Sequence, residues 1–307
     1  MKLVFFGTPD FAVPSLQSLH ASPHEVLSVV TNPDKKSGRG LKLNSSPVKK
    51  TGESLGLDII QPDDLKDENF ISYLKQINPD IYVVVAFKIL PEMLLTLPVA
   101  GAINLHASLL PKYRGAAPIN HAILNGETQT GLTTFQLKKK VDTGNILLQK
   151  TIPISRTATV GDLYYQLSQM GGDILIDTLN GIEKKSITPQ PQNEIYTSSA
   201  PKISAKDALI DWKNSAIAIH NRIRAFTPKP GAFTFYNNKR IKLFNSEIEN
   251  TESSLIPGEI RYENTNLIIG TGEGSVLIKE IQMEGKKRLP VSQFIAGNQH
   301  IIGEYFG

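Results

Sequence analysis

The sequence contains no cysteine among its 307 residues. This absence excludes disulfide bonds, zinc–thiolate centres and thiol catalysis, and it fits a reducing compartment. No apolar run approaches the roughly 18 residues that a membrane-spanning helix needs. The apolar start MKLVFFGTPDF meets Pro and Asp too early for a secretory signal. We therefore expect a cytoplasmic protein that does not cross a membrane.

The common nucleotide-binding fingerprints are also missing. GTPDF, which follows the first apolar run, is not G-x-G-x-x-G, and the chain has no G-x-x-x-x-G-K-[ST] motif. The usual dinucleotide and triphosphate sites are therefore excluded. We predict no metal site either.

What the first 185 residues do contain is an alternation of strand and helix signals. The expected strands are KLVFFG, EVLSVVT, LDIIQP, DIYVVVAF, GAINLH, GLTTFQL and NILLQKTIPI. The expected helices run from Pro9 to about 20 with Thr8 as cap, from Pro47 with Ser46 as cap, over about 66–77, and over 159–182. This alternation predicts an α/β fold with an open, mostly parallel, Rossmann-like sheet that helices cover on both faces.

The composition changes at residue 186. Residues 186–205 are rich in Pro, Gln and Ser without apolar periodicity, which predicts a linker between a domain at 1–185 and another at 206–307. The second domain begins with a helix expected over 210–226. Short alternating strands follow, with Asn237-Asn238 as a hairpin turn, and they predict a small β-barrel.

The formal net charge is +4, and its distribution is uneven. Two segments lack acidic residues altogether. The first has Lys35, Lys36, Arg39, Lys42, Lys49 and Lys50, and the second has Arg222, Arg224, Lys229, Lys239, Arg240 and Lys242. A solvated lysine face is the commoner explanation of any one such run. Two of them in different halves of the chain point to a phosphate-bearing ligand.

Two polar side chains end the strand GAINLH. Side chains alternate along a strand, so Asn104 and His106 point to the same side, at the sheet edge where open α/β sheets place ligands. An imidazole needs a partner that fixes its tautomer. Asp142 in KKKVDTG also follows a strand and is the best candidate.

An amide, an imidazole and a carboxylate without a metal or an evident nucleophile suit direct acyl transfer. An amine attacks a carbonyl carbon and His106 takes the amine proton. Asp142 stabilises the imidazolium, while Asn104 donates to the oxyanion. No covalent enzyme intermediate is needed.

Five stretches carry a resemblance to a known family. They are GTPDFA, PDKKSGRGLKLNSSPVK, NLHASLLPKYRGAAPINHAILNGE, VDTG and IRAFTPKPGAF, in this order along essentially the whole chain. Together they closely resemble the methionyl-tRNA formyltransferase family. The central stretch is typical of all folate-dependent formyltransferases, whereas the GRG loop and the RAFTPKPGA segment are typical of the enzymes that act on tRNA.

The resemblance implies transfer of a formyl group from 10-formyltetrahydrofolate to the α-amino group of methionyl initiator tRNA, in translation initiation. It places the catalytic residues at Asn104, His106 and Asp142, and a folate-lining segment at Ser108, Leu109, Leu110 and Pro111. It assigns tRNA binding to loop 32–46, with Arg39 as the key residue beside Lys35, Lys36 and Lys42. The C-terminal domain is then an OB-like barrel that helps to hold tRNA, and we expect a monomer.

The chain departs from the family pattern at two places. It has LKKKVDTG where members usually have MDxGLDTG, and VVAFKILP where they usually have the longer VVAYGxILP. The second loop borders the family's folate pocket, so no pterin contact is assigned to Lys88. Three other functions stay open from the residues: formyl transfer to an aminosugar nucleotide, hydrolysis of the formyl donor, and RNA binding without catalysis.

Overall fold

The computed structural model describes residues 1–37, 42–250 and 253–307. They form two compact units. The first contains Met1–Gly115, Thr130–Ile152 and Tyr164–Ala200, and the second contains Ala116–Gln129, Pro153–Leu163 and Pro201–Gly307. Residues 186–200, most of the predicted linker, thus belong to the first unit. The domain boundaries expected at 185 and 205 stay predictions.

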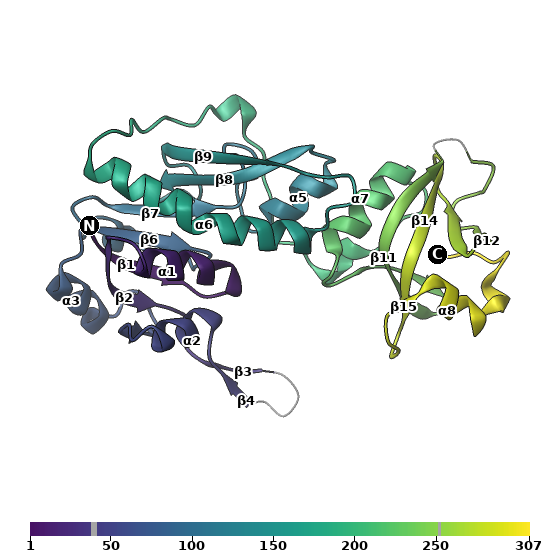
Figure 1. The fold of residues 1–307 in the computed structure, drawn as a ribbon, viewed down its shortest axis with the longest axis horizontal. Coiled ribbons are helices and arrows are strands. Elements are labelled where there is room, and N and C mark those ends of the chain that lie inside the picture. The colour runs from purple at the N-terminus through teal and green to yellow at the C-terminus, as the bar shows by residue number, and fades with distance from the viewer. Residues whose placement is uncertain (38–41, 251–252) are drawn as a thin grey trace. The chain divides into compact units, whose positions relative to one another are not determined.

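The first unit is built on a seven-stranded sheet in the order β5-β2-β1-β6-β7-β8-β9 (Figure 1). Its strands are β1 (Lys2–Gly7), β2 (Glu25–Val30), β5 (Ile59–Ile60), β6 (Ile81–Val85), β7 (Ala102–His106), β8 (Gln129–Gln136) and β9 (Ile146–Pro153). The five neighbouring strands β5, β2, β1, β6 and β7 are parallel, and β8 is antiparallel to β7. The predicted Rossmann-like, mostly parallel sheet is confirmed.

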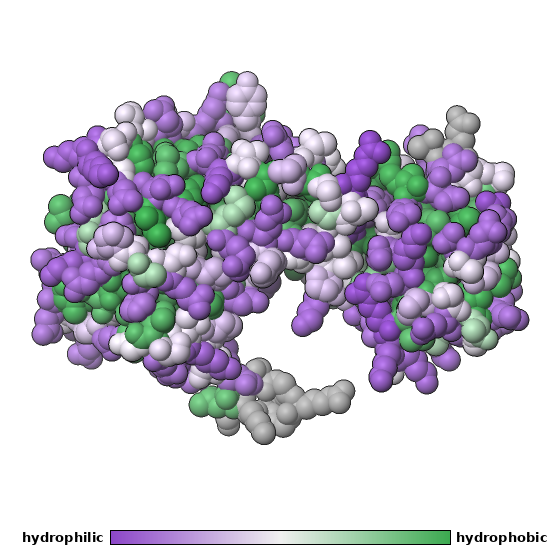
Figure 2. Space-filling view, in the orientation of Figure 1, coloured by the Kyte–Doolittle hydropathy of each residue, from purple (hydrophilic) through white to green (hydrophobic). Residues whose placement is uncertain are grey.

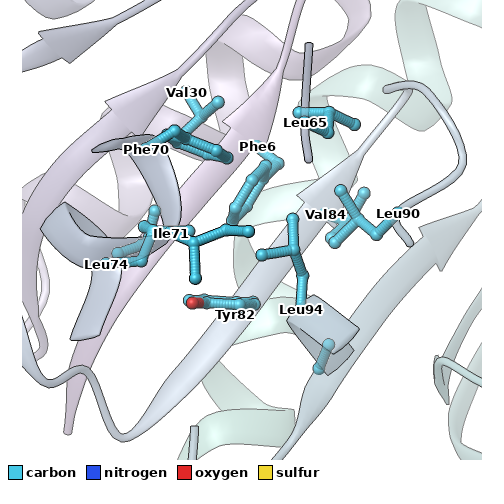
Figure 3. Packing of buried hydrophobic residues seen from close by; sticks show 12 residues of the cluster. Phe6, Val30, Leu65, Phe70, Ile71, Leu74, Tyr82, Val84, Leu90 and Leu94 are labelled. Atoms are coloured by element: carbon cyan, nitrogen blue, oxygen red, sulfur yellow. The ribbon is translucent and has the colours of Figure 1, made fainter. Parts of the chain in front are cut away.

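Helices cover both faces of this sheet. They are α1 (Val13–His20), α2 (Pro47–Ser54), α3 (Glu68–Ile77), α4 (Glu92–Leu95) and α6 (Val160–Glu183). On one face, Phe70 and Leu74 of α3 pack on Phe6, Tyr82 and other strand residues (Figure 3). On the other face, α6 comes so close to α1 and β7 that a Cβ at Gly171 would lie 2.5 Å from the hydroxyl of Ser15 and 2.8 Å from Leu105.

The helix starts follow local capping chemistry. Ser46 caps α2 by accepting a hydrogen bond from the Lys49 amide, as predicted. The helix expected over 66–77 begins at Glu68 behind Asp67, which accepts from the Phe70 amide. The expected start at Pro9 is wrong. Pro9 is extended (ψ 171°) and precedes a 3₁₀ turn at Asp10–Ala12, so α1 begins only at Val13.

The second unit contains a six-stranded antiparallel sheet in the order β10-β11-β14-β13-β12, with β15 paired to β14. Its elements are α5 (Pro118–Leu124), α7 (Ala216–Phe226), β10 (Ala232–Tyr236), β11 (Lys239–Asn250), β12 (Ile260–Glu263), β13 (Asn266–Gly270), β14 (Ser275–Met283), β15 (Leu289–Pro290) and α8 (Val291–Ala296). Asn237 and Asn238, both with positive φ, form the predicted turn. The helix expected from 210 begins at Ala216, because Ser215 caps it.

The surfaces of both units are mostly hydrophilic, and hydrophobic residues occur in small groups on the face drawn in Figure 2. Within the part of the chain that the structure describes, no helix combines the length and the apolar character needed to cross a bilayer.

Buried His220 should make the second unit sensitive to acid. Its Nδ1 contacts the Ser246 hydroxyl at 2.9 Å and its Nε2 contacts the Arg156 carbonyl at 2.8 Å. Burial, and secondarily the charge of Arg224, lower the pKa of His220, against a raising contribution from the hydrogen bond to Arg156. In the unfolded chain the pKa is about 6.5. Below that pH the unfolded state binds a proton that the native state does not, so stability is lost as the pH falls.

We therefore expect the free energy of unfolding to decrease between pH 7 and pH 5.5, and to decrease less in a His220→Gln variant. Denaturant unfolding at several pH values measures this difference. The pKa of His24 in the first unit is also lowered by burial, but His24 contributes equally to the pH dependence of the wild type and of the His220→Gln variant. Equal slopes for wild type and variant would contradict the prediction.

Candidate functional site

Asn104 and His106 lie on β7, on the sheet face that carries the cluster of Figure 3. Asn104 is paired with Val84 of β6, and Val84 and Ala102 both belong to that cluster. Because alternate residues of a strand share a face, the amide and the imidazole project from the same side of β7, as predicted. Asn104 is half-buried, and its side chain makes no hydrogen bond within the described residues. Its amide N–H groups are therefore available to an incoming oxygen.

The tautomer of His106 is set by the main chain. Its ring is 7% exposed and its Nε2 lies 2.8 Å from the carbonyl oxygen of Tyr113. A carbonyl only accepts, so Nε2 carries a hydrogen and the neutral ring has its lone pair on Nδ1. Phe135 packs against the ring in a T-shaped arrangement, with centroids 6.4 Å apart. The nitrogen that can accept a proton is therefore Nδ1.

Asp142 faces that nitrogen. Its Oδ2 lies 3.8 Å from His106 Nδ1, which is close enough for an ion pair but too far for a hydrogen bond. The same oxygen accepts a 2.9 Å hydrogen bond from the Gly115 amide. The expected pairing of His106 with Asp142 is present as an electrostatic contact. Tyr113, and not Asp142, fixes the tautomer.

The route by which Asp142 reaches His106 differs from a simple meeting of strand ends. Since β8 runs antiparallel to β7, its last residue, Gln136, is paired with Ile103, whereas His106 is paired with Thr133. The segment after β8 must therefore turn back. Gly144 permits the turn, because a Cβ there would lie only 1.5 Å from the Gln136 carbonyl oxygen.

The two residues that face the ring nitrogens of His106 have left-handed backbones. Tyr113 has φ 62° and Asp142 has φ 53°, a region that such side chains seldom adopt. Hydrogen bonds of the surrounding loops hold both in place. Conformations of this kind cluster at functional sites, where the surroundings over-determine them.

The predicted folate-lining segment forms the turn after β7. Ser108 is buried and its hydroxyl donates to the Lys112 carbonyl, while Leu110 is buried and its amide donates to Thr133 Oγ1. Leu109 and Pro111 are half-buried. Ser108 and Leu110 thus shape the turn, which leaves Leu109 and Pro111 as the side chains of this segment with surface to offer a ligand.

The predicted tRNA-binding loop 32–46 contains a short antiparallel ladder, β3 (Lys35–Ser37) with β4 (Lys42–Asn44). Lys35 is exposed. Lys36 and Lys42 are described only as members of this ladder, and Arg39 lies outside the described residues. The expectation of a continuous loop is corrected by the ladder, which pairs Lys36 with Leu43.

Not every cation of the two basic segments is available to a ligand. Lys49 forms a 2.8 Å ion pair with half-buried Asp34, and this hydrogen bond lowers the pKa of the Asp34 carboxyl. In the second segment Arg224 is buried and donates to the Ala158 carbonyl and to Asn221 Oδ1. These two cations stabilise the fold, so the charge of a run overstates its binding capacity.

Two contributors to the site went unrecognised in the sequence. They are the Tyr113 carbonyl, which holds His106, and the Gly115 amide, which holds Asp142. Both are main-chain groups, so their residue types carry no signal. In residues 1–37, 42–250 and 253–307, no group of three or more His, Asp or Glu side chains is placed to bind a metal ion. The arrangement offers an amide donor, a proton acceptor and a carboxylate, which is the set needed for direct acyl transfer.

Comparison with protein-family models matches residues 1–179 to the formyl transferase family and residues 202–299 to the formyl transferase C-terminal domain. A methionyl-tRNA formyltransferase of Caldanaerobacter subterraneus is 42% identical, with 97% of each chain covered. A methionyl-tRNA formyltransferase of Thermodesulfovibrio yellowstonii is 45% identical over 97% of this chain and 96% of its own.

Solved structures share the fold at lower identity. A sugar 3N-formyl transferase, crystallised in the presence of dTDP and 5-N-formyl-THF, has a TM-score of 0.69 and 23% identity over 94% of this chain and 99% of its own. A methionyl-tRNA formyltransferase from Clostridium thermocellum has a TM-score of 0.55 and 17% identity, over 81% of this chain and 94% of its own.

Proposed function

Because the chain belongs to the methionyl-tRNA formyltransferase family, we propose that it formylates methionyl initiator tRNA with Asn104, His106 and Asp142 as its catalytic residues. The observation that carries the assignment of the site is the position of Asp142 Oδ2, 3.8 Å from the only ring nitrogen of His106 that is free to accept a proton. The fold supports a folate-type formyl donor, and we propose 10-formyltetrahydrofolate.

The proposed reaction proceeds by direct attack. The α-amine of the methionyl ester adds to the formyl carbon, a C–N bond forms, and the carbonyl electrons move onto oxygen. Asn104 donates its free amide N–H to that oxygen. His106 Nδ1 accepts the proton that the amine loses, and the imidazolium then faces the Asp142 carboxylate. The oxyanion electrons then re-form the carbonyl, the bond between the formyl carbon and the donor nitrogen breaks, and Nδ1–H gives its proton to that leaving nitrogen.

The amine itself needs little activation. A free α-amine has a pKa of about 7.7–8.0, so roughly 10–20% of it is already unprotonated at pH 7. A modest base held in place is then sufficient, and the buried ring of His106 meets that need. Arg39, Lys35, Lys36 and Lys42 are our candidates for the tRNA phosphates, because the run is free of acidic residues and the β3–β4 ladder brings its three lysines together. We propose that the protein acts as a monomer in the cytoplasm.

Formyl transfer to charged tRNA tests the function. We expect rapid transfer to initiator methionyl-tRNA and much slower transfer to elongator methionyl-tRNA. Both present the same methionyl ester, so a difference arises only from contacts with the RNA. Radiolabelled formyl transfer, run beside a TDP-linked aminosugar acceptor and a no-acceptor sample, measures it. Preference for the sugar, or formate release without an acceptor, would replace the proposal by one of the two alternative enzymes.

The catalytic residues are tested by substitution. His106→Ala removes the proton acceptor, and Asp142→Asn removes the charge while leaving an oxygen for the Gly115 amide. We expect each to lower kcat by about 100-fold or more, and Asn104→Ala to lower it by about 100- to 1000-fold. Thermal melts should stay close to wild type for Asp142→Asn. Near-normal turnover in any of the three would refute that residue's role.

Arg39 is tested by separate titration of the two substrates. We expect Arg39→Ala to weaken tRNA binding. Because fewer counterions are released, the slope of the log binding constant against log salt concentration should become shallower by about one unit. Folate binding should stay unchanged. Lys50→Ala is the matched control, since it removes an exposed cation of the same run from α2. Equal effects of the two substitutions on tRNA would show that Arg39 acts only through net charge.

A further inference from the structure

We propose that Gln192 is a positioning residue that fixes the Asp142 loop and the Tyr113–Gly115 loop relative to each other. This inference rests on the proposed roles of His106 and Asp142. Gln192 lies in the polar segment whose composition predicts only a linker. It is half-buried in the first unit, which also contains both loops.

The side-chain amide of Gln192 is fully used. Its Nε2 donates to the carbonyl oxygens of Asp142 at 2.9 Å and Gly144 at 2.8 Å. Its Oε1 accepts from Arg114 Nε at 3.0 Å and from a terminal nitrogen of Arg114 at 2.7 Å. Carbonyls only accept and a guanidinium only donates, so a side chain between them must donate on one side and accept on the other. The Gln amide meets both demands, with two N–H groups for the carbonyls and one oxygen for the guanidinium.

The two loops that Gln192 joins hold the two members of the catalytic pair. On one side it anchors the carbonyls of Asp142 and Gly144, which limits movement of the Asp142 loop. On the other it anchors Arg114, whose neighbours are Tyr113, the partner of His106, and Gly115, the partner of Asp142. The 3.8 Å separation of the imidazole and the carboxylate is therefore held through Gln192.

The same segment contributes a second line of contacts. The Arg114 amide donates to the Ser198 carbonyl at 2.9 Å, and the Ala200 amide donates to the Arg114 carbonyl at 2.7 Å. The Ser198 hydroxyl accepts from the Tyr113 amide at 2.9 Å. These bonds keep residues 113–115 in place without Gln192. Loss of the Gln192 amide should then release mainly the Asp142 loop and leave the fold intact.

Gln192→Glu is the sharpest test, because it keeps the shape and the acceptor for Arg114 but replaces the donor by an oxygen that repels two carbonyls. We expect kcat to fall by about 10- to 100-fold, the loss typical of a misplacement near 1 Å. KM for either substrate and the melting temperature should change little. Gln192→Ala, which adds no charge, should lower kcat in the same way. Gln190→Glu is the matched control, since among the described residues the Gln190 side chain donates only to the nearby Thr188 carbonyl.

Hydrogen exchange of the Gly115 amide gives a readout that does not need activity. This amide is protected by Asp142, so both Gln192 variants should exchange faster there than wild type, and Gln190→Glu should not. A wild-type protein that forms no formyl-methionyl-tRNA would overturn the proposed function, while the exchange rates would still report on positioning. Unchanged exchange, kcat within about twofold of wild type, or losses that only parallel loss of folded protein would overturn the role of Gln192.

Discussion

The hydrogen bond between His106 Nε2 and the Tyr113 carbonyl decides which nitrogen can take part in proton transfer. It leaves Nδ1 as the acceptor and turns it toward Asp142. If the ring carried its hydrogen on Nδ1 instead, its acceptor nitrogen would face a carbonyl oxygen and no proton could be taken up near the carboxylate. The left-handed backbone at Tyr113 is the local cost of presenting that carbonyl, and the Ser198 hydroxyl helps to maintain it.

The antiparallel direction of β8 imposes the second constraint. A parallel strand beside β7 would end at the same edge as His106, whereas β8 ends beside Ile103. Asp142 can reach the imidazole only through a loop that turns back against β8, and the absence of a side chain at Gly144 allows the necessary close approach. A returning loop has few neighbours of its own, so the Gly115 amide supplies the contact that a packed strand would otherwise provide.

Much of the fold, and the shared face of Asn104 and His106, could be predicted from local sequence pattern. Apolar runs and caps such as Ser46 placed most strands and helices, and strand alternation placed Asn104 and His106 on one face. The start of α1 was misplaced because Pro9 is extended, which pattern alone does not reveal. The tautomer could not be predicted, since it depends on a main-chain carbonyl that any residue at position 113 would carry. Gln192 could not be predicted either, because its role arises only when three distant segments meet.

Arg114 brings a positive charge to the segment whose neighbouring residues, Tyr113 and Gly115, contact His106 and Asp142. A guanidinium pairs most strongly with a carboxylate that accepts from two of its N–H groups. Glu194 supplies this carboxylate: two hydrogen bonds join it to Arg114, and these bonds lower the pKa of the Glu194 carboxyl, so it stays ionised. The guanidinium is then fixed between Glu194 and the Gln192 side-chain oxygen. A segment that looks like a connector in the sequence thus holds Arg114 through two of its side chains, beside the residues that contact His106 and Asp142.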